Sequence, residues 1–321
     1  MNGPKEVSEL NSPIAKLAAG ALGVAMIVAP ASTQVSRYHG ARPGMLVSTE
    51  WLQRHLGDAN LVVLHVGREP HEYDEAHIPR ARFLPLDELV EQHADSLNEL
   101  PPVTALQEVF GSLGVGSATK VVLYDEGGGL LAARAYFTLD YLGYGDRVAI
   151  LNGGFEKWTS ENRMTSDEAA HPIAGVFTAQ QRADVRITTS QMHALVKQRG
   201  LGNASDYVLL DARSAREYEG AVRSQGVSQT GHLPGAHSLY WKTLVQSGPV
   251  PVLRSTEELK RSFAEAGAGP DKLIVTYCRT GMQSSFTYFV AKYLGYRVTM
   301  YDGSVYEWVH RGGYELVVNE P

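Results

Sequence analysis

The sequence is poor in cysteine, since its 321 residues include only one, Cys278. A lone cysteine excludes an intramolecular disulfide and every zinc or iron–sulfur site that needs several thiolates. The eleven histidines include no pair at the HExxH or HxxxH spacing of metal-binding helices. The sequence therefore predicts a protein without a bound metal, and nothing in it indicates another cofactor.

Positive charge is also scarce. The chain has 29 lysines and arginines against 35 acidic residues, a formal net charge of −6, and no basic stripe. This balance argues against a nucleic-acid partner. A hydrophobic content of 44% and a charged content of 20% are typical of a soluble globular protein, and the length suggests two domains. We expect the chain to act as a monomer.

Long apolar runs are missing except for one near the N-terminus, Leu17–Ala31. It is short for a membrane span, so we expect no stable span in the mature chain. Lys5 and Lys16 precede it, and Ala29–Ala31 has the small-x-small form of a cleavage site, which is typical of a secretory signal peptide. The alternative is an apolar helical extension packed on the domain. If this segment is a cleaved signal peptide, the protein is expected in the periplasm or elsewhere outside the cytoplasm. If it is not, a cytoplasmic location is expected.

The remainder of the chain repeats itself, and the repeat indicates the architecture better than any local propensity. The matched segments are 61–66 and 207–212, 76–81 and 231–236, 121–125 and 274–278, 141–144 and 293–296, and 152–158 and 302–308. Each copy alternates short apolar strands with helical stretches, which predicts parallel strands joined by right-handed crossovers. The predicted fold class is α/β, with two tandem domains.

Composition sets the expected boundaries of these domains. A signal peptide and a flexible lead-in are expected within 1–43, and the first domain within 44–160. The polar, non-periodic segment 161–186 predicts a linker, and the second domain is expected within 187–321.

Cys278 follows the apolar run 273–277, which predicts a buried strand, and precedes 284–294, which predicts a helix. At such a turn, backbone N–H groups converge and the helix dipole favours a thiolate, the nucleophilic form of cysteine. A buried free cysteine can instead be a small hydrophobe, but the flanking Arg279, Gly281 and Ser284 favour an anion cradle. The first copy has Asp125 at the matching position, so we expect it to serve as a scaffold and one wall of the cleft.

These segments resemble two-domain rhodanese-type sulfurtransferases, the thiosulfate and 3-mercaptopyruvate sulfurtransferase family. The resemblance covers Val47–Trp308 and includes the loop CRTGMQSS at 278–285. It implies two rhodanese-like domains, each a five-stranded parallel sheet with helices on both faces, of which the second is catalytic. It also implies sulfur transfer through a persulfide of Cys278, from a small anionic donor to a thiophilic acceptor such as cyanide or a thiol.

The resemblance also implies which residues meet the substrate. The expected set is Arg279, Thr280, Gly281, Met282, Gln283, Ser284, Arg213 and Arg216. An arginine directly after the cysteine resembles thiosulfate-type members, although Thr280 and Gln283 stand where these loops often carry a second basic residue. Arg213 either buttresses the fold or touches substrate.

Five further residues are expected to be structural. His77 and His232 occupy matching loops, so backbone groups are expected to satisfy both. Trp158 and Trp308 end matched units and are expected in the core or at an interface. Glu307 is expected on a helix surface, the alternative being a hydrogen bond near the cleft.

Three other functions are alternatives to this one. The donor can be 3-mercaptopyruvate instead of thiosulfate. The chain can also be a low-turnover persulfide carrier that hands sulfur to a protein partner, because carrier and enzyme need the same loop. A cysteine phosphatase or arsenate reductase needs an arginine six residues after the cysteine to clasp an oxyanion, and this chain has Ser284 there.

Overall fold

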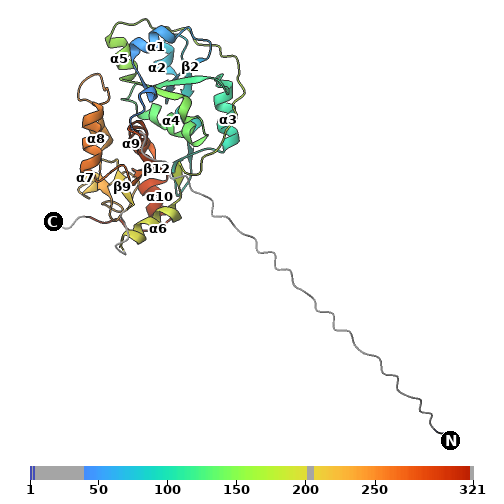
Figure 1. Ribbon diagram of the computed structural model, residues 1–321, viewed down its shortest axis with the longest axis vertical. Helices are drawn as coiled ribbons and strands as arrows, with labels where there is room; N and C mark the ends of the chain where they lie inside the picture. Colours follow the sequence, from blue (N-terminus) through green and yellow to red (C-terminus); the bar gives the residue numbers. More distant parts are fainter. Residues whose placement is uncertain (2, 4–39, 201–205, 319–321) are drawn as a thin grey trace, which may run out of the picture. The chain divides into compact units, whose positions relative to one another are not determined.

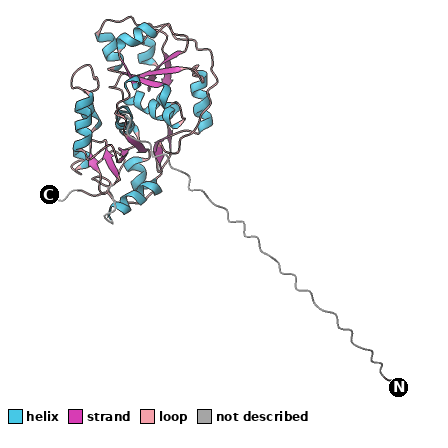
Figure 2. Cartoon of the chain, in the orientation of Figure 1, coloured by secondary structure: helices cyan, strands magenta, loops and turns pink. Residues whose placement is uncertain are grey.

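The computed structural model describes residues 1, 3, 40–200 and 206–318, and its two five-stranded parallel sheets mark two domains (Figures 1 and 2). The first sheet has the strand order β1-β7-β6-β2-β3 and the second β10-β9-β11-β12-β8. Their strands are β1 (Leu46–Val47), β2 (Leu61–Gly67), β3 (Arg82–Pro85), β6 (Lys120–Tyr124), β7 (Val148–Leu151), β8 (Arg186–Ile187), β9 (Tyr207–Asp211), β10 (His237–Ser238), β11 (Leu273–Tyr277) and β12 (Arg297–Tyr301). The predicted α/β class is confirmed.

The two domains have the same topology. The strands β8, β9, β10, β11 and β12 occupy in the second sheet the places of β1, β2, β3, β6 and β7 in the first. The α-helices are α1 (Thr49–His55), α2 (His71–Glu75), α3 (Val103–Ser112), α4 (Leu130–Tyr141), α5 (Gly154–Ser160), α6 (Thr189–Gly200), α7 (Ala215–Tyr218), α8 (Thr256–Glu265), α9 (Met282–Tyr293) and α10 (Ser304–His310). The first domain adds an antiparallel hairpin, β4 (Glu91–Gln92) with β5 (Leu97–Glu99).

Helices cover both faces of each sheet. Successive side chains along a strand point to opposite faces, and on both faces they are buried in apolar clusters. Val62 and Leu64 of β2 point into one apolar cluster, whereas Val63 points into another with Leu52 of α1 and Trp158 of α5. The neighbouring side chains of β9 divide between two clusters in the same way. A strand that is buried on both faces is expected to be continuously apolar, as these runs are.

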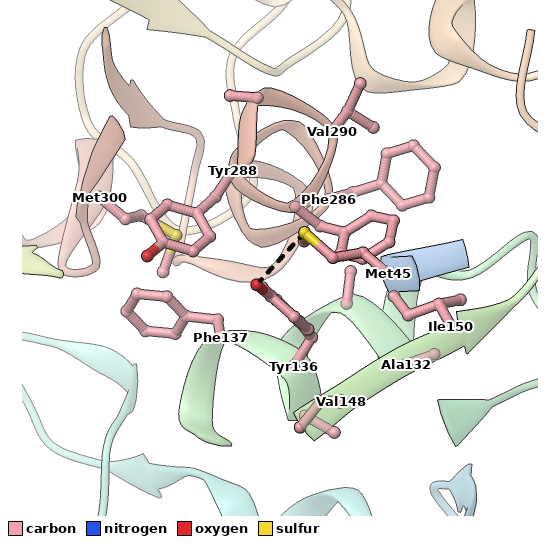
Figure 3. Close-up of a cluster of buried hydrophobic side chains, with 14 of the residues drawn as sticks. Met45, Ala132, Tyr136, Phe137, Val148, Ile150, Phe286, Tyr288, Val290 and Met300 are labelled. Atoms are coloured by element: carbon pink, nitrogen blue, oxygen red, sulfur yellow. Dashed lines mark hydrogen bonds between the residues drawn. The ribbon is translucent and has the colours of Figure 1, made fainter. Parts of the chain in front are cut away.

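The two domains share one of these apolar clusters, and α4 and α9 meet inside it (Figure 3). Tyr136 of α4 meets Phe289 of α9 edge-on with ring centroids 5.0 Å apart, and Phe137 meets Tyr288 likewise at 5.3 Å. The hydroxyl of Tyr136 lies 3.9 Å from the sulfur of Met45. Because this core is continuous, each domain helps to hold the other's helix in place.

The segments outside the sheets are also anchored. Within the predicted linker 161–186, Phe177 is buried against Phe110, and the Gly175 N–H donates to the Gly111 carbonyl. Below residue 44, the Arg42 N–H donates to the Tyr293 carbonyl at 2.7 Å, so this end of the expected lead-in is bonded to the second domain.

The predicted signal peptide, Leu17–Ala31, lies outside the described residues. Among the residues that the structure does describe, no helix combines the length and apolar character of a membrane span.

The shared core predicts a large effect for Phe137→Ala. The side chain is fully buried between the domains, so its removal is expected to lower the free energy of unfolding by about 3–5 kcal/mol. Denaturant unfolding measures this change. The control Ile173→Ala, at a 90% exposed side chain, is expected to stay within about 0.5 kcal/mol of the parent. Equal effects of the two variants would contradict the shared core.

Candidate functional site

Cys278 lies at the carboxyl end of β11, the central strand of the second sheet, directly before α9. Ligands of parallel sheets commonly bind at this edge. The residue is 1% exposed, so its sulfur is almost completely shielded from solvent. We call residues 278–284, which run from the end of β11 into the first turn of α9, the Cys278 loop. Gly281, with φ of +83°, lets the chain turn from this loop into α9.

The carbonyl groups at the start of the Cys278 loop are bonded to α10. The Cys278 carbonyl accepts from the Val305 N–H at 3.1 Å, and the Arg279 carbonyl accepts from the Tyr306 N–H at 2.9 Å. In a trans peptide the N–H points away from the carbonyl. The amides that follow these two carbonyls therefore face away from α10.

Five N–H groups of the Cys278 loop have no hydrogen-bond partner among the described residues. They belong to Arg279, Thr280, Met282, Gln283 and Ser284. The first amides of a helix lack intrahelical partners and carry its partial positive charge, which makes this turn a binding place for an anion.

Two serine hydroxyls stand beside the sulfur. The Ser304 oxygen accepts from the N–H groups of Cys278 at 3.0 Å and Gly281 at 3.2 Å, and it lies 4.0 Å from the Cys278 sulfur. Its proton is then directed either to the Tyr301 carbonyl at 3.0 Å or to the sulfur. The Ser284 hydroxyl lies 3.5 Å from the sulfur on another side. Both hydroxyls can donate to a negatively charged sulfur.

Ser304 is not among the site residues expected from the sequence, although the repeat contains a signal for it. Ser304 has φ of +56°, a left-handed conformation that is costly for a residue with a side chain. The matching residue of the first domain is Gly154, which has the same φ of +56°. A serine at a position suited to glycine indicates that its hydroxyl is needed there.

The other expected site residues lie at different depths. Arg279 is half-buried at the start of the loop, and its guanidinium donates to the carbonyl and side-chain oxygens of Gln225 at 3.1 and 3.3 Å. Met282 is buried, and Gln283 has a buried side-chain oxygen without a partner among the described residues. Arg216 is exposed on α7.

Arg213 is buried and fully engaged by neighbours. Its guanidinium is bonded to the Asp211 carboxylate at 2.5 Å, to the Ser224 hydroxyl and to the Gly231 carbonyl. Burial lowers the pKa of Arg213, but the charge of Asp211 and the hydrogen bonds to it raise the pKa by more. The pKa of Arg213 is therefore above its usual value. These contacts favour the buttressing role of Arg213 over direct contact with substrate.

The expected structural residues are in place, with one correction. His77 and His232 are buried, and their Nδ1 atoms contact the carbonyls of Tyr73 and Tyr218. Trp158 and Trp308 are 1% exposed core residues. Placing Glu307 on a helix surface was wrong, because it is buried.

The first domain covers the face of α10 that holds Glu307. There Glu307 pairs with Arg311, which reaches Asp95 of the first domain.

The first domain holds an anion of its own at the matching position. The Asp125 carboxylate follows β6 and accepts from the N–H groups of Gly127, Gly129, Leu131 and Ala132 at 2.6–3.2 Å. Burial raises the pKa of Asp125, and these four bonds act in the opposite direction. The turn before α4 thus binds a negative group that belongs to the chain itself, so it has no place for another.

Glu126 follows Asp125 and occupies the position that Arg279 has in the second domain. Burial raises its pKa to about 7, with further contributions from Glu72 and Glu156. The buried His65 lies 3.9 Å from it, and burial lowers the pKa of this imidazole to about 4. The residue after the first position of the loop is therefore acidic in the first domain, where it is Glu126, and basic in the second, where it is Arg279. No group of potential metal ligands occurs within 40–200 and 206–318.

Known proteins match this chain over both domains. The family described as rhodanese-like domain matches residues 48–161 and 194–311. A thiosulfate sulfurtransferase of Azotobacter vinelandii is 35% identical over 262 residues, which are 80% of this chain and 91% of that protein. The sulfur carrier protein TtuD of Thermus thermophilus is 32% identical over 295 residues, 87% of this chain and 99% of the other.

Among solved structures, the anaerobic ergothioneine biosynthesis enzyme from Chlorobium limicola has a TM-score of 0.76. It is 23% identical, with 86% of this chain and 71% of the other covered. At this level of identity the likeness supports the fold.

The acidic surroundings of Glu126 predict a pH-dependent gain in stability for Glu126→Gln. A carboxyl with a raised pKa in the folded state stabilises the fold below its unfolded pKa of about 4.5, and this contribution is lost as the pH rises to about 7. At pH 8 the variant is expected to melt about 1–2 °C above the parent, and at pH 4 no difference is expected. The exposed Glu108→Gln is the control. A gain that is equal at both pH values would contradict the raised pKa.

Ser304→Gly tests the hydroxyl beside the sulfur. Glycine adopts this backbone conformation without strain, as Gly154 does, so the melting temperature is expected to be unchanged or higher. Loss of the acceptor for two loop amides is expected to lower kcat/KM for sulfur transfer about tenfold. Steady-state kinetics and thermal melting measure the two effects. Unchanged kcat/KM would restrict Ser304 to shaping the turn.

Proposed function

We propose that this chain, which belongs to the family of rhodanese-like domain proteins, carries sulfur from thiosulfate to cyanide or a thiol through a persulfide on Cys278. It is a rhodanese-type sulfurtransferase, as its thiosulfate sulfurtransferase relatives show. The donor, the persulfide and the residue roles are our proposal. The observation that carries them is the turn after β11, where five loop amides have no partner among the described residues and two hydroxyls lie 3.5 and 4.0 Å from the cysteine sulfur.

The reaction consists of two displacements on sulfur. The Cys278 thiolate attacks the outer sulfur of thiosulfate, a sulfur–sulfur bond forms to the enzyme, and the sulfur–sulfur bond of thiosulfate breaks to release sulfite. Cyanide or a thiolate then attacks the outer sulfur of the persulfide and regenerates the Cys278 thiolate. Charge and atoms balance in each step without a metal or an oxidant, and the order predicts ping-pong kinetics.

The loop stabilises negative charge in both forms of the enzyme. Thiolate and persulfide are anions, and the free amides of the Cys278 loop are fixed donors for either. The hydroxyls of Ser284 and Ser304 add two donors whose protons can turn towards the sulfur. The thiol, which is neutral, benefits less from these groups, so the loop favours the reactive state.

Arg279 supports an anionic donor. Its guanidinium lies half-buried at the loop and is held by Gln225, and thiosulfate carries two negative charges. Relatives named thiosulfate sulfurtransferase favour the same donor. The near-complete burial of Cys278 favours a small donor as well.

A carrier function is the second candidate, because one relative is named a sulfur carrier protein. A carrier would hold its persulfide stably and release it to a protein partner. Slow turnover of thiosulfate with cyanide, combined with a stable sulfur adduct, would favour this function over that of an enzyme.

Comparison of donors tests the proposal. Thiosulfate is expected to have at least about a tenfold higher kcat/KM than 3-mercaptopyruvate, with cyanide as the acceptor. Cys278→Ser is expected to abolish thiocyanate formation while its melting temperature stays near that of the parent. A preference for 3-mercaptopyruvate would reverse the assigned donor, and activity retained in Cys278→Ser would contradict the mechanism.

A further inference from the structure

We propose that Asn98 of the first domain is a positioning residue that orients the Thr280–Gly281 peptide, whose amide in turn holds the Ser304 hydroxyl beside the sulfur of the second domain. This inference rests on the proposed function. Asn98 lies in the short strand β5, and its side-chain Nδ2 donates to both the carbonyl and the hydroxyl of Thr280, at 3.2 and 2.9 Å. Thr280 is two residues after Cys278, so the contact is made on the Cys278 loop itself.

The contact fixes one peptide plane. The Thr280 carbonyl and the Gly281 N–H belong to the same peptide and point in opposite directions. Asn98 holds the carbonyl end, and the Ser304 oxygen holds the N–H end at 3.2 Å. The Ser304 oxygen also lies 4.0 Å from the Cys278 sulfur, so the held amide helps to fix a hydroxyl that can donate to the sulfur. The first domain therefore determines the direction of a donor in the second.

Asn98 is itself held rigidly. Its Oδ1 accepts from the Gln92 side chain at 2.9 Å, which leaves Nδ2 to face Thr280. The backbone N–H of Asn98 donates to the side-chain oxygen of Gln92 at 3.3 Å. Its φ is +57°, a conformation that asparagine tolerates better than most residues but that still costs free energy. These contacts orient the side chain before any substrate binds.

Arg134 of α4 joins the two ends of this arrangement. Its fully buried guanidinium donates to the Asn98 carbonyl at 2.5 Å and to the Asp302 carboxylate at 2.5 and 3.3 Å. Asp302 stands two residues before Ser304, and a side chain at Gly281 would overlap its carboxylate. One arginine of the first domain thus connects Asn98 with the turn that carries Ser304.

The loop of the first domain cannot take part in the reaction, because the Asp125 carboxylate occupies its amides. Through Asn98, the first domain nevertheless contributes to the site of the second. A misdirected Gly281 amide would no longer hold the Ser304 hydroxyl, which would then stabilise the thiolate and the persulfide less, whereas the packing between the domains would persist through α4 and α9. Loss of the Asn98 side chain should therefore reduce the chemistry at Cys278 without a matching loss of stability.

The variant Asn98→Gly tests this proposal. Glycine keeps the left-handed backbone and the carbonyl that Arg134 binds, and removes the side-chain donor to Thr280 together with the oxygen that accepts from Gln92. The matched control is Asn162→Gly, since Asn162 has φ of +54° and is exposed at the end of α5, outside the site. Three measurements apply to both variants: thermal melting, kcat/KM for thiosulfate, and the rate of alkylation of Cys278 by iodoacetamide.

For Asn98→Gly we expect kcat/KM and the alkylation rate at pH 7 to fall about tenfold, with a melting temperature within about 2 °C of the control. Thr280→Val, which removes the hydroxyl but keeps the carbonyl, is expected to have a smaller effect. The double variant should be no slower than Asn98→Gly alone, because both losses concern the same contact.

Unchanged kcat/KM and alkylation in Asn98→Gly would overturn the proposal, as would additive effects in the double variant. Failure of the proposed function gives a different result, in which the parent protein does not turn over thiosulfate. The alkylation rates of Asn98→Gly and its control still test the role of Asn98 in that case.

Discussion

The site depends on the direction of the peptide planes in the loop after β11. Hydrogen bonds from α10 and from Asn98 hold the carbonyls of Cys278, Arg279 and Thr280, so each following N–H points away from these donors. A planar trans peptide leaves no freedom to change one end without the other. The chain thus builds a binding place for an anion from backbone amides, whose direction is set by two backbone donors of α10 and by the side chain of Asn98.

The first domain shows what the same turn does without a nucleophile. Its amides bind the carboxylate of Asp125, whereas the loop amides that follow Cys278 in the second domain have no partner among the described residues, apart from the Gly281 amide that Ser304 holds. At the next position Glu126 replaces Arg279, so the first loop lacks the positive charge that the second has. The duplication has produced one domain that reacts and one that supports it, through the shared core and through Asn98.

Much of this could be predicted from the sequence, because repeats and apolar strands are local patterns. The strand 273–277 was expected and found, and the helix after it begins at Met282, two residues before the expected Ser284, because Gly281 turns the chain earlier. Ser304 and Asn98 were missed, since their roles come from contacts between segments distant in the sequence. The prediction that Glu307 lies on a helix surface was wrong, because the first domain covers that face of α10. The sequence of α10 alone marks this face as polar.

Mass spectrometry of the intact protein tests the central claim most directly. After incubation with thiosulfate, the account predicts a gain of one sulfur atom per chain, located on the peptide that contains Cys278. Addition of cyanide should remove that sulfur and release one equivalent of thiocyanate. A protein that never gains the sulfur, or gains it equally as Cys278→Ser, would contradict the account.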